Sequence, residues 1–142
     1  MGVRGLGEIA LRVDDLEGMR AFYEDVVGLE FMKRFEHAVF FRIAEGFGGH
    51  TQILALFDRA AAPIRPDFFP TAFRKVDQPS SSLDHLAFEI DLSSIETEHR
   101  RLESLGVEIK TVEFGWAHWR SLFFRDPEGN TVEFVAYDAT VE

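Results

Sequence analysis

The feature that most limits the fold of this chain is an internal repeat. The segment EIALRVDD begins at Glu8, and HLAFEIDL begins 77 residues later, at His85. Both segments alternate apolar with polar residues, as half-buried strands do. Both also have alanine at the third position and aspartate at the seventh. A fixed offset of this kind indicates two copies of one structural unit.

A helix is expected after each copy of the repeated strand. In the first copy, apolar residues at helical spacing form one stripe: Leu16, Met19, Phe22, Tyr23, Val26 and Val27. Asp14 or Asp15 can cap the start of this helix, and Gly28 suits its end. In the second copy, Ser93 and Glu96 have the spacing of a capping box.

Three further strands are expected in each copy. They fall at about 30–35, 38–43, 51–57, 107–113, 117–125 and 131–137. Each copy therefore has the order βαβββ, and the fold class is α+β. Because neither copy can cover its own sheet on both faces, the two copies are expected to pack into one structure. We predict a single domain over 1–142, with module one at about 5–57, a linker at about 58–82 and module two at about 83–138.

The segment between the modules has two interpretations. Residues 58–82 contain four of the five prolines and three phenylalanines. This composition suits a plain linker between the modules. It also suits a lid whose aromatic side chains close over a cavity, because long loops in compact domains are often functional.

The charge of the chain excludes several classes of partner. The formal net charge is -10, and no segment is rich in Lys and Arg. A chain of this kind is a poor ligand for nucleic acid or for anionic membrane surfaces. The chain has no cysteine, which excludes disulfide and thiolate chemistry. No apolar run reaches membrane-spanning length or forms a signal sequence, so a cytoplasmic protein is expected.

Two segments resemble one known family. EIALRVDDLEGMRAFYEDVVGLEF and FFRDPEGNTVEFV, within a tandem βαβββ arrangement, resemble the vicinal oxygen chelate superfamily. That superfamily includes glyoxalase I, extradiol dioxygenases, and fosfomycin- and bleomycin-resistance proteins. The resemblance implies an open, barrel-like, eight-stranded sheet around a cavity. It also implies a homodimer and a small-molecule substrate or ligand.

The resemblance also implies a metal site. Family members bind a divalent ion through residues of the first and last strand of each module. The matching positions here are Glu8, His85 and Glu133, and the fourth position is Ala55. One imidazole and two carboxylates can bind one divalent ion such as Fe, Mn, Zn or Ni. Without an ion, His85 could instead be an ordinary strand histidine and Glu133 a surface acid.

Four more residues are candidates for contact with a substrate. Arg12 shares the strand face of the first proposed ligand and could bind an anionic group; alternatively it forms a salt bridge with Glu89. His118 and Arg120 alternate along the expected strand at 117–125, so they either line the cavity or form a solvated face. Tyr137 is a candidate for proton transfer.

Two functions from different classes fit these residues. In the first, a metal-dependent enzyme of the dioxygenase or lyase/isomerase type chelates two neighbouring oxygens of a small substrate. Ala55 argues against lactoylglutathione lyase, since a methyl group cannot accept a proton. In the second, a metal-free protein sequesters a drug, as bleomycin-resistance proteins do; Trp116 and Trp119 would then form an aromatic pocket rather than core packing. An accessory protein with a decayed site is a third possibility.

Overall fold

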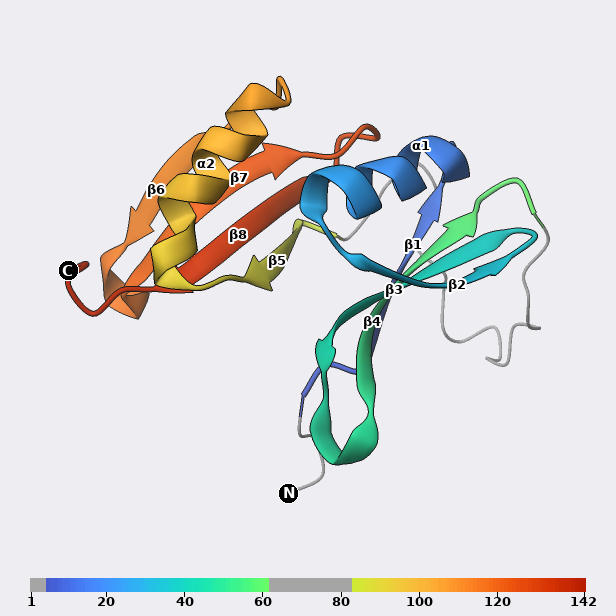
Figure 1. Ribbon diagram of the computed structural model, residues 1–142, viewed down its shortest axis with the longest axis horizontal. Coiled ribbons are helices and arrows are strands. Elements are labelled where there is room, and N and C mark those ends of the chain that lie inside the picture. Colours follow the sequence, from blue (N-terminus) through green and yellow to red (C-terminus); the bar gives the residue numbers. More distant parts are fainter. Residues whose placement is uncertain (1–4, 62–82) are drawn as a thin grey trace, which may run out of the picture. The chain divides into compact units, whose positions relative to one another are not determined.

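The structure is a computed structural model that describes residues 5–61 and 83–142 (Figure 1). The described residues divide into two compact units, one on each side of the gap. The segment 58–82 was expected to be either a linker or a lid. From residue 62 onward it lies outside the described residues. The two units correspond to the two modules expected from the repeat, and each has its own four-stranded sheet.

Unit 1 has the expected βαβββ order. Its elements are β1 (Glu8–Val13), α1 (Leu16–Ala21), the π-helical turn η1 (Phe22–Val27), β2 (Glu30–Phe35), β3 (Ala38–Glu45), the short turn η2 (Phe47–Gly49) and β4 (Thr51–Asp58). The sheet order is β1-β4-β3-β2, with β1 parallel to β4 and the other pairs antiparallel.

The helix of unit 1 confirms the expected stripe and caps. The Asp15 side chain accepts a hydrogen bond from the backbone N–H of Gly18 at 3.0 Å, which satisfies one free donor of the first turn. Five of the six residues of the apolar stripe are buried, and Met19 and Tyr23 are both 0 % exposed. Gly28 ends the helical segment in the left-handed conformation, with φ of 87°, as glycine does at helix C-termini.

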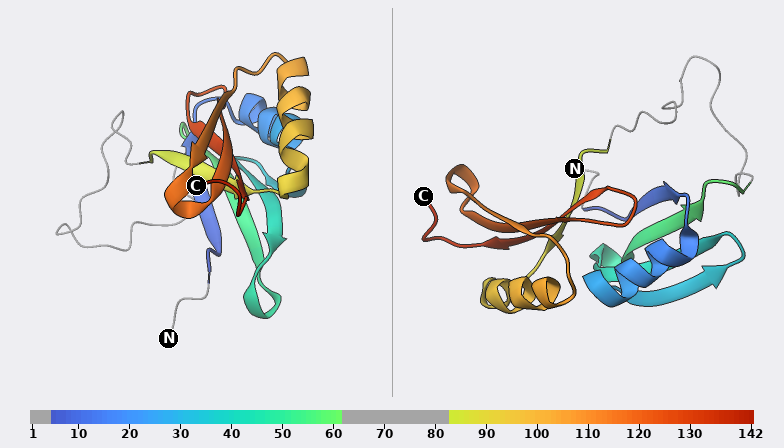
Figure 2. Two further views of the ribbon diagram at one scale, coloured as in Figure 1. Left: turned by 90° about the vertical axis from the view of Figure 1, so that its left-hand side faces the viewer. Right: turned by 90° about the horizontal axis from the view of Figure 1, so that it is seen from above.

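Unit 2 repeats the same order. Its elements are β5 (His85–Glu89), the short turn η3 (Leu92–Ser94), α2 (Ile95–Ser104), β6 (Lys110–Phe114), the short turn η4 (Gly115–Ala117), β7 (Trp119–Arg125) and β8 (Thr131–Tyr137). The sheet order is β5-β8-β7-β6, again with its first pair parallel. Helix α2 lies along one face of this sheet (Figures 1 and 2).

Three local expectations for unit 2 are wrong. The strand expected at 107–113 begins three residues later, at Lys110. The capping box at Ser93 and Glu96 is not formed, because a 3-10 turn precedes α2 and places Ser94 at its N-cap without a side-chain hydrogen bond. The strand expected at 117–125 begins two residues later, at Trp119. His118 precedes it in the left-handed conformation, with φ of 56°, so it does not belong to that strand.

The strand registers of the two units match position by position. In unit 1 they pair Glu8 with Ile53 and Ala10 with Ala55; in unit 2 they pair His85 with Thr131 and Ala87 with Glu133. The first strand is parallel to the last in both units. The α+β class and the eight strands in two βαβββ halves are therefore confirmed, and Ala55 holds the position in unit 1 that Glu133 holds in unit 2.

The two faces of the unit 2 sheet differ in character. One face carries the buried side chains of Leu122, Phe124, Val132, Phe134 and Ala136, next to Leu102 of α2. The other face carries Glu133 beside its antiparallel partner Phe123. The second face is free of α2 and is the one that can receive a ligand.

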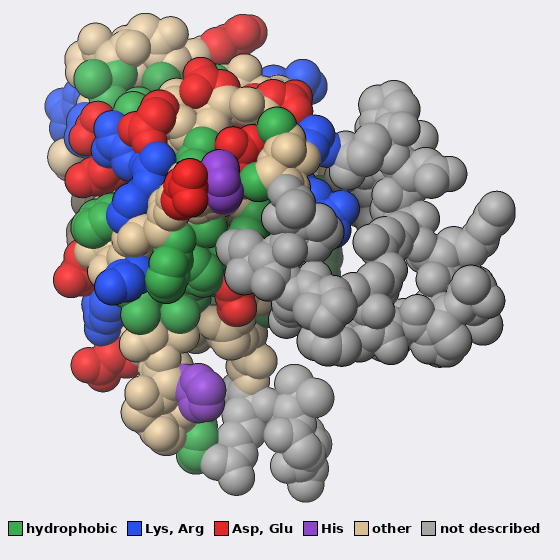
Figure 3. Space-filling model, turned by 90° about the vertical axis from the view of Figure 1, so that its right-hand side faces the viewer, with side chains coloured by type: hydrophobic (Ala, Val, Ile, Leu, Met, Phe, Trp, Pro, Cys, Tyr) green, Lys and Arg blue, Asp and Glu red, His purple; other side chains and the backbone are tan. Residues whose placement is uncertain are grey.

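The surface agrees with the charge of the sequence. On the face shown in Figure 3, Lys and Arg side chains are interspersed with Asp and Glu rather than gathered in one patch. Among the described residues, no helix is both long and apolar enough to cross a membrane.

Candidate active site

Glu133 is a buried acid at the centre of the open face of unit 2. It lies in β8 and is 3 % exposed. A buried carboxylate is costly unless it is hydrogen-bonded or paired. Here the Ser121 hydroxyl, in the neighbouring strand β7, donates to Glu133 Oε1 at 2.7 Å. This burial excludes the alternative that Glu133 is a solvated surface acid.

His85 lies beside Glu133 and is held between two carboxylates. Its Nε2 is 3.2 Å from Glu133 Oε2, and its Nδ1 is 2.7 Å from Asp84 Oδ2. Ionised carboxylates only accept hydrogen bonds, so both ring nitrogens donate when the imidazole carries two protons. The contact with Asp84 fixes the ring so that Nε2 points at Glu133. The side chain of His85 is 39 % exposed, which leaves it accessible from solvent.

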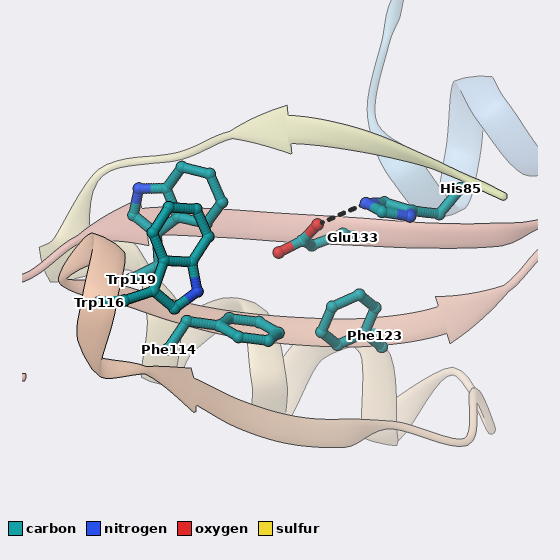
Figure 4. Close-up of a pocket in the computed structure, with 6 residues that line it drawn as sticks. All are labelled: His85, Phe114, Trp116, Trp119, Phe123 and Glu133. Atoms are coloured by element: carbon teal, nitrogen blue, oxygen red, sulfur yellow. Dashed lines mark ion pairs between the residues drawn. The ribbon is translucent and has the colours of Figure 1, made fainter.

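A pocket of about 210 Å³ opens next to this pair (Figure 4). Its lining comprises His85, Phe114, Trp116, Trp119, Phe123 and Glu133. The Phe123 ring lies edge-on to the His85 ring at 6.1 Å, and the two indoles lie 5.6 Å apart. The pocket thus has a polar end at His85 and Glu133 and an aromatic wall.

Trp116 does not serve as core packing. It is 82 % exposed, although it is one of the largest apolar side chains of the protein, and Trp119 is 38 % exposed. Both line the pocket. Of the two interpretations of the tryptophans, the structure therefore favours the aromatic pocket.

Glu8 and Arg12 lie in unit 1. Both are exposed and share one face of β1, opposite to the buried Leu11 and Val13. The register places Ala55 on the same face. The convergence of Glu8 with the two residues of unit 2 stays a prediction, as does the choice between a substrate contact and a salt bridge to Glu89 for Arg12. Within each unit, the described residues contain no cluster of three or more His, Asp or Glu side chains suited to a metal.

Arg120 and Glu133 lie on opposite faces of the sheet. Glu133 is paired with Phe123, and Arg120 is paired with Ala136. Because side chains alternate along a strand, Arg120 and Phe123, three positions apart, point to opposite faces. The guanidinium of Arg120 contacts Asp138 at 2.9 Å and Glu113 at 3.0 Å. It therefore ties strands together on the face away from the pocket.

His118 and Tyr137 both neighbour Trp119, since His118 precedes it in the chain and Tyr137 is its partner in β8. His118 Nδ1 is 2.6 Å from the backbone oxygen of Val141, and its ring is 5.9 Å from the ring of Tyr137. Tyr137 shares the face of Glu133, because residues two or four apart on a strand point the same way. It is 61 % exposed. Neither residue is among those that line the pocket, and their contact with a substrate stays a prediction.

Ser121 and Asp84 are site residues that the sequence analysis missed. Ser121 is fully buried, and it alternates with Trp119 and Phe123 along β7. This alternation could have indicated a role for Ser121 in the site, because a lone serine between aromatic residues on an inward face needs a polar partner. For Asp84 the signal was its position directly before His85.

Asp138 carries a pKa shift that gives a testable pH dependence. The Thr140 hydroxyl and backbone N–H, and then Arg120, donate hydrogen bonds that lower the pKa of Asp138 below its ordinary value of 3.8. A lowered pKa adds stability above 3.8 that is lost as the pH falls through the folded value. Asp138→Asn is therefore expected to destabilise the protein at neutral pH, with a difference that shrinks at pH values below 3.8. Urea unfolding across this range measures it, with the exposed Asp25→Asn as control; a pH-independent difference would contradict the assignment.

Known proteins resemble the chain over nearly its whole length. The family model of the Glyoxalase/Bleomycin resistance protein/Dioxygenase superfamily matches residues 5–134. A lactoylglutathione lyase from Agrobacterium tumefaciens has 26 % sequence identity and a TM-score of 0.69, with 96 % of each chain covered. An integron cassette protein from the Halifax Harbour sewage outfall has 26 % identity and a TM-score of 0.68, with 94 % of this chain and 99 % of that chain covered.

A more distant structure shares the fold. It is a mutant of the fosfomycin resistance protein FosX from Listeria monocytogenes, in complex with Mn(II) and 1S,2S-dihydroxypropylphosphonic acid. It has 22 % identity and a TM-score of 0.65, with 96 % of this chain and 93 % of that chain covered. Comparison with curated proteins gave no match. The family match and the paired βαβββ units together show that the chain belongs to the Glyoxalase/Bleomycin resistance protein/Dioxygenase superfamily.

Proposed function

We propose that this protein is a divalent-metal-dependent enzyme that acts on a small substrate with two neighbouring oxygens. The observation that carries the proposal is the pair His85 and Glu133, in which a buried carboxylate and an oriented imidazole meet at 3.2 Å beside a pocket. The expected reaction is of the dioxygenase or lyase/isomerase type. Fe, Mn, Zn and Ni are the candidate ions.

The geometry of the pair fits two ligands of one ion. Nitrogen and oxygen ligands lie about 2.0–2.2 Å from such a metal, so neighbouring ligands are about 3.0–3.4 Å apart. The Nε2 to Oε2 distance of 3.2 Å lies in this range. Metal-binding histidines usually donate their other ring N–H to a carboxylate, which fixes the ring. Asp84 provides that carboxylate, and Ser121 provides the hydrogen bond that orients Glu133.

Glu8 is proposed as the third ligand. Its register in unit 1 matches that of His85 in unit 2, so the repeat relates the two positions. Three protein ligands leave coordination positions for substrate oxygens. When bound, the ion would act as a Lewis acid that polarises those oxygens. Arg12, on the strand face of Glu8, is available to bind an anionic group of the substrate.

The remaining residues of the pocket orient the substrate and exclude water. The rings of Phe114 and Phe123 flank the polar end and lower the local dielectric constant, which strengthens charge interactions there. Tyr137 lies on the same face and is the candidate for proton transfer. A homodimer is expected on the family resemblance.

A metal-free binding protein is the second candidate function. Four of the six residues that line the pocket are aromatic, and Trp116 is 82 % exposed. Together with the net charge of -10, such a pocket suits an aromatic, cationic ligand. In this case His85 and Glu133 form an ion pair instead of binding a metal.

Metal content separates the two functions. The protein is purified without chelator, dialysed separately against Mn, Fe, Zn or Ni, and analysed by mass spectrometry for bound metal per chain. We expect one ion per chain for at least one of these metals. If none is retained, and an aromatic cation binds to the pocket, the enzyme proposal is wrong and the binding protein is favoured.

A further inference from the structure

Residues 138–142 are bonded to the turn that carries the aromatic wall. The backbone N–H of Asp138 donates to the backbone oxygen of His118 at 2.7 Å, and His118 Nδ1 is 2.6 Å from the oxygen of Val141. A carbonyl oxygen can only accept, so Nδ1 is the donor. Val141 is 4 % exposed, so this segment is anchored in the unit. A Cβ added to Gly115 would collide with the backbone of Glu142.

The turn itself is held in an unusual conformation. Among the described residues other than glycine, His118 is the one with a positive φ, at 56°. Its N–H closes the turn by donating to Gly115 O at 3.2 Å. Residues in this conformation persist when surrounding contacts fix them, and they often occur at functional sites. The hydrogen bonds between His118 and residues 138–142 are contacts that can fix this conformation.

Asp138 ties the same segment to both strands that flank the turn. Its side chain accepts from Thr140 at 2.7 Å and from Arg120 of β7 at 2.9 Å, and Arg120 also contacts Glu113 of β6 at 3.0 Å. The turn η4 joins β6 to β7 and includes Trp116. Trp119 follows as the first residue of β7. The position of both indoles therefore depends on contacts made by residues 138–142.

We propose that His118 and residues 138–142 act as a latch that positions Trp116 and Trp119, and so sets the shape of the pocket at its aromatic end. His118 and Asp138 are then positioning residues rather than residues that contact the substrate. The effect of the latch on a ligand rests on the proposed function of the pocket. Its effect on the indoles does not.

The two tryptophans provide a direct measurement, because they are the only two in the chain. Their rings are 5.6 Å apart at an interplanar angle of 54°, so their transitions couple and give a far-UV circular dichroism couplet. His118→Ala removes the side-chain hydrogen bond to the backbone oxygen of Val141. The alanine that replaces His118 also disfavours a positive φ. The couplet is expected to fall by at least half. His118→Asn should restore part of it, since asparagine tolerates this conformation and its amide can donate.

Two controls separate a local effect from general destabilisation. His99→Ala removes a half-exposed histidine on α2, outside the latch, and should leave the couplet unchanged. Ile95→Val shortens a buried side chain of α2, so it should lower the melting temperature without changing the couplet. If His118→Ala does not fold, Thr140→Val provides the same test, because it removes the hydroxyl that donates a hydrogen bond to Asp138. An unchanged couplet in the folded latch variant would overturn the proposal.

The second measurement concerns the pocket. Catechol, a ring with two neighbouring oxygens, serves as the probe for the metal-loaded protein and is titrated by calorimetry. His118→Ala is expected to weaken catechol binding about tenfold or more while metal content stays unchanged, because His85 and Glu133 lie outside the latch. If wild-type protein retains metal but catechol binding is equal in the variant, the role of the latch at the pocket is wrong. If wild-type protein retains no metal, the proposed function is wrong. The couplet would still test whether the latch positions the two indoles.

Discussion

His85→Ala is expected to abolish stoichiometric metal binding while the protein remains folded. The imidazole is one of the two ligands proposed in unit 2, and its Nε2 is 3.2 Å from Glu133 Oε2. Among the described residues that line this pocket, His85 and Glu133 are the two whose side chains can bind a metal. Because its side chain is 39 % exposed, its removal opens no enclosed core cavity, and Ser121 still donates to Glu133, so the protein should remain folded. Mass spectrometry of bound metal and far-UV circular dichroism measure the two outcomes.

Graded variants test the proposed ligand set more finely. Asp84→Asn keeps the shape of the side chain but removes the charge that fixes His85, and loss of such a partner typically weakens metal binding 10–100-fold. Glu133→Gln removes the negative charge of the other proposed ligand and should also weaken metal binding. His99→Ala is the matched control, since it removes a half-exposed histidine of α2. Retention of a full equivalent of metal by His85→Ala would show that the ion, if any, is bound elsewhere.

The metal-loaded protein is expected to have little or no lactoylglutathione lyase activity. The strand register places Ala55 where unit 2 has Glu133, and Ala55 is 0 % exposed. Isomerisation of this kind needs a base beside the metal, and loss of a positioned base typically lowers the rate by about 10²–10⁴. In the proposed site Glu8 is itself a ligand, so it would be poorly placed to replace that base.

The assay uses the hemithioacetal of methylglyoxal and glutathione as substrate. Its positive control is the lactoylglutathione lyase from Agrobacterium tumefaciens, which is 26 % identical to this chain. Metal content is measured on the same samples, so that low activity cannot be assigned to metal loss. A turnover of about 1–10³ per second, the usual range for enzymes, would show that Ala55 is no obstacle and that the proposed site is assigned incorrectly.

The repeat made most of the fold predictable from the sequence. Alternation over Glu8–Val13 and His85–Glu89 predicted the first strand of each unit, because period-2 patterning follows from strand geometry. A constant offset between copies then predicted which positions are equivalent. The structure pairs Ala55 and Glu133 with equivalent neighbours, as that offset required. These features depend on local geometry and on spacing along the chain, and both are properties of the sequence.

The partners of the site residues were decided by tertiary structure. Alternation placed Glu133 on one face of its strand, but it did not show that Ser121 of a neighbouring strand would donate to it at 2.7 Å. Cross-strand partners depend on register, and register here depends on where β7 begins. The left-handed conformation of His118 starts that strand at Trp119, against a sequence expectation of 117.

The same limit applies to charge pairs. Arg120 was a candidate for the cavity, yet it contacts Glu113 and Asp138 on the other face of the sheet. The sequence by itself determined the βαβββ repeat, the strand positions of His85 and Glu133, and the alanine at position 55. The tertiary structure alone decided that Glu133 is buried, that Ser121 donates to it, and that residues 138–142 form hydrogen bonds with His118. The physical reason is that burial and hydrogen bonding arise between segments distant in the chain, which local patterns of hydrophobicity do not specify.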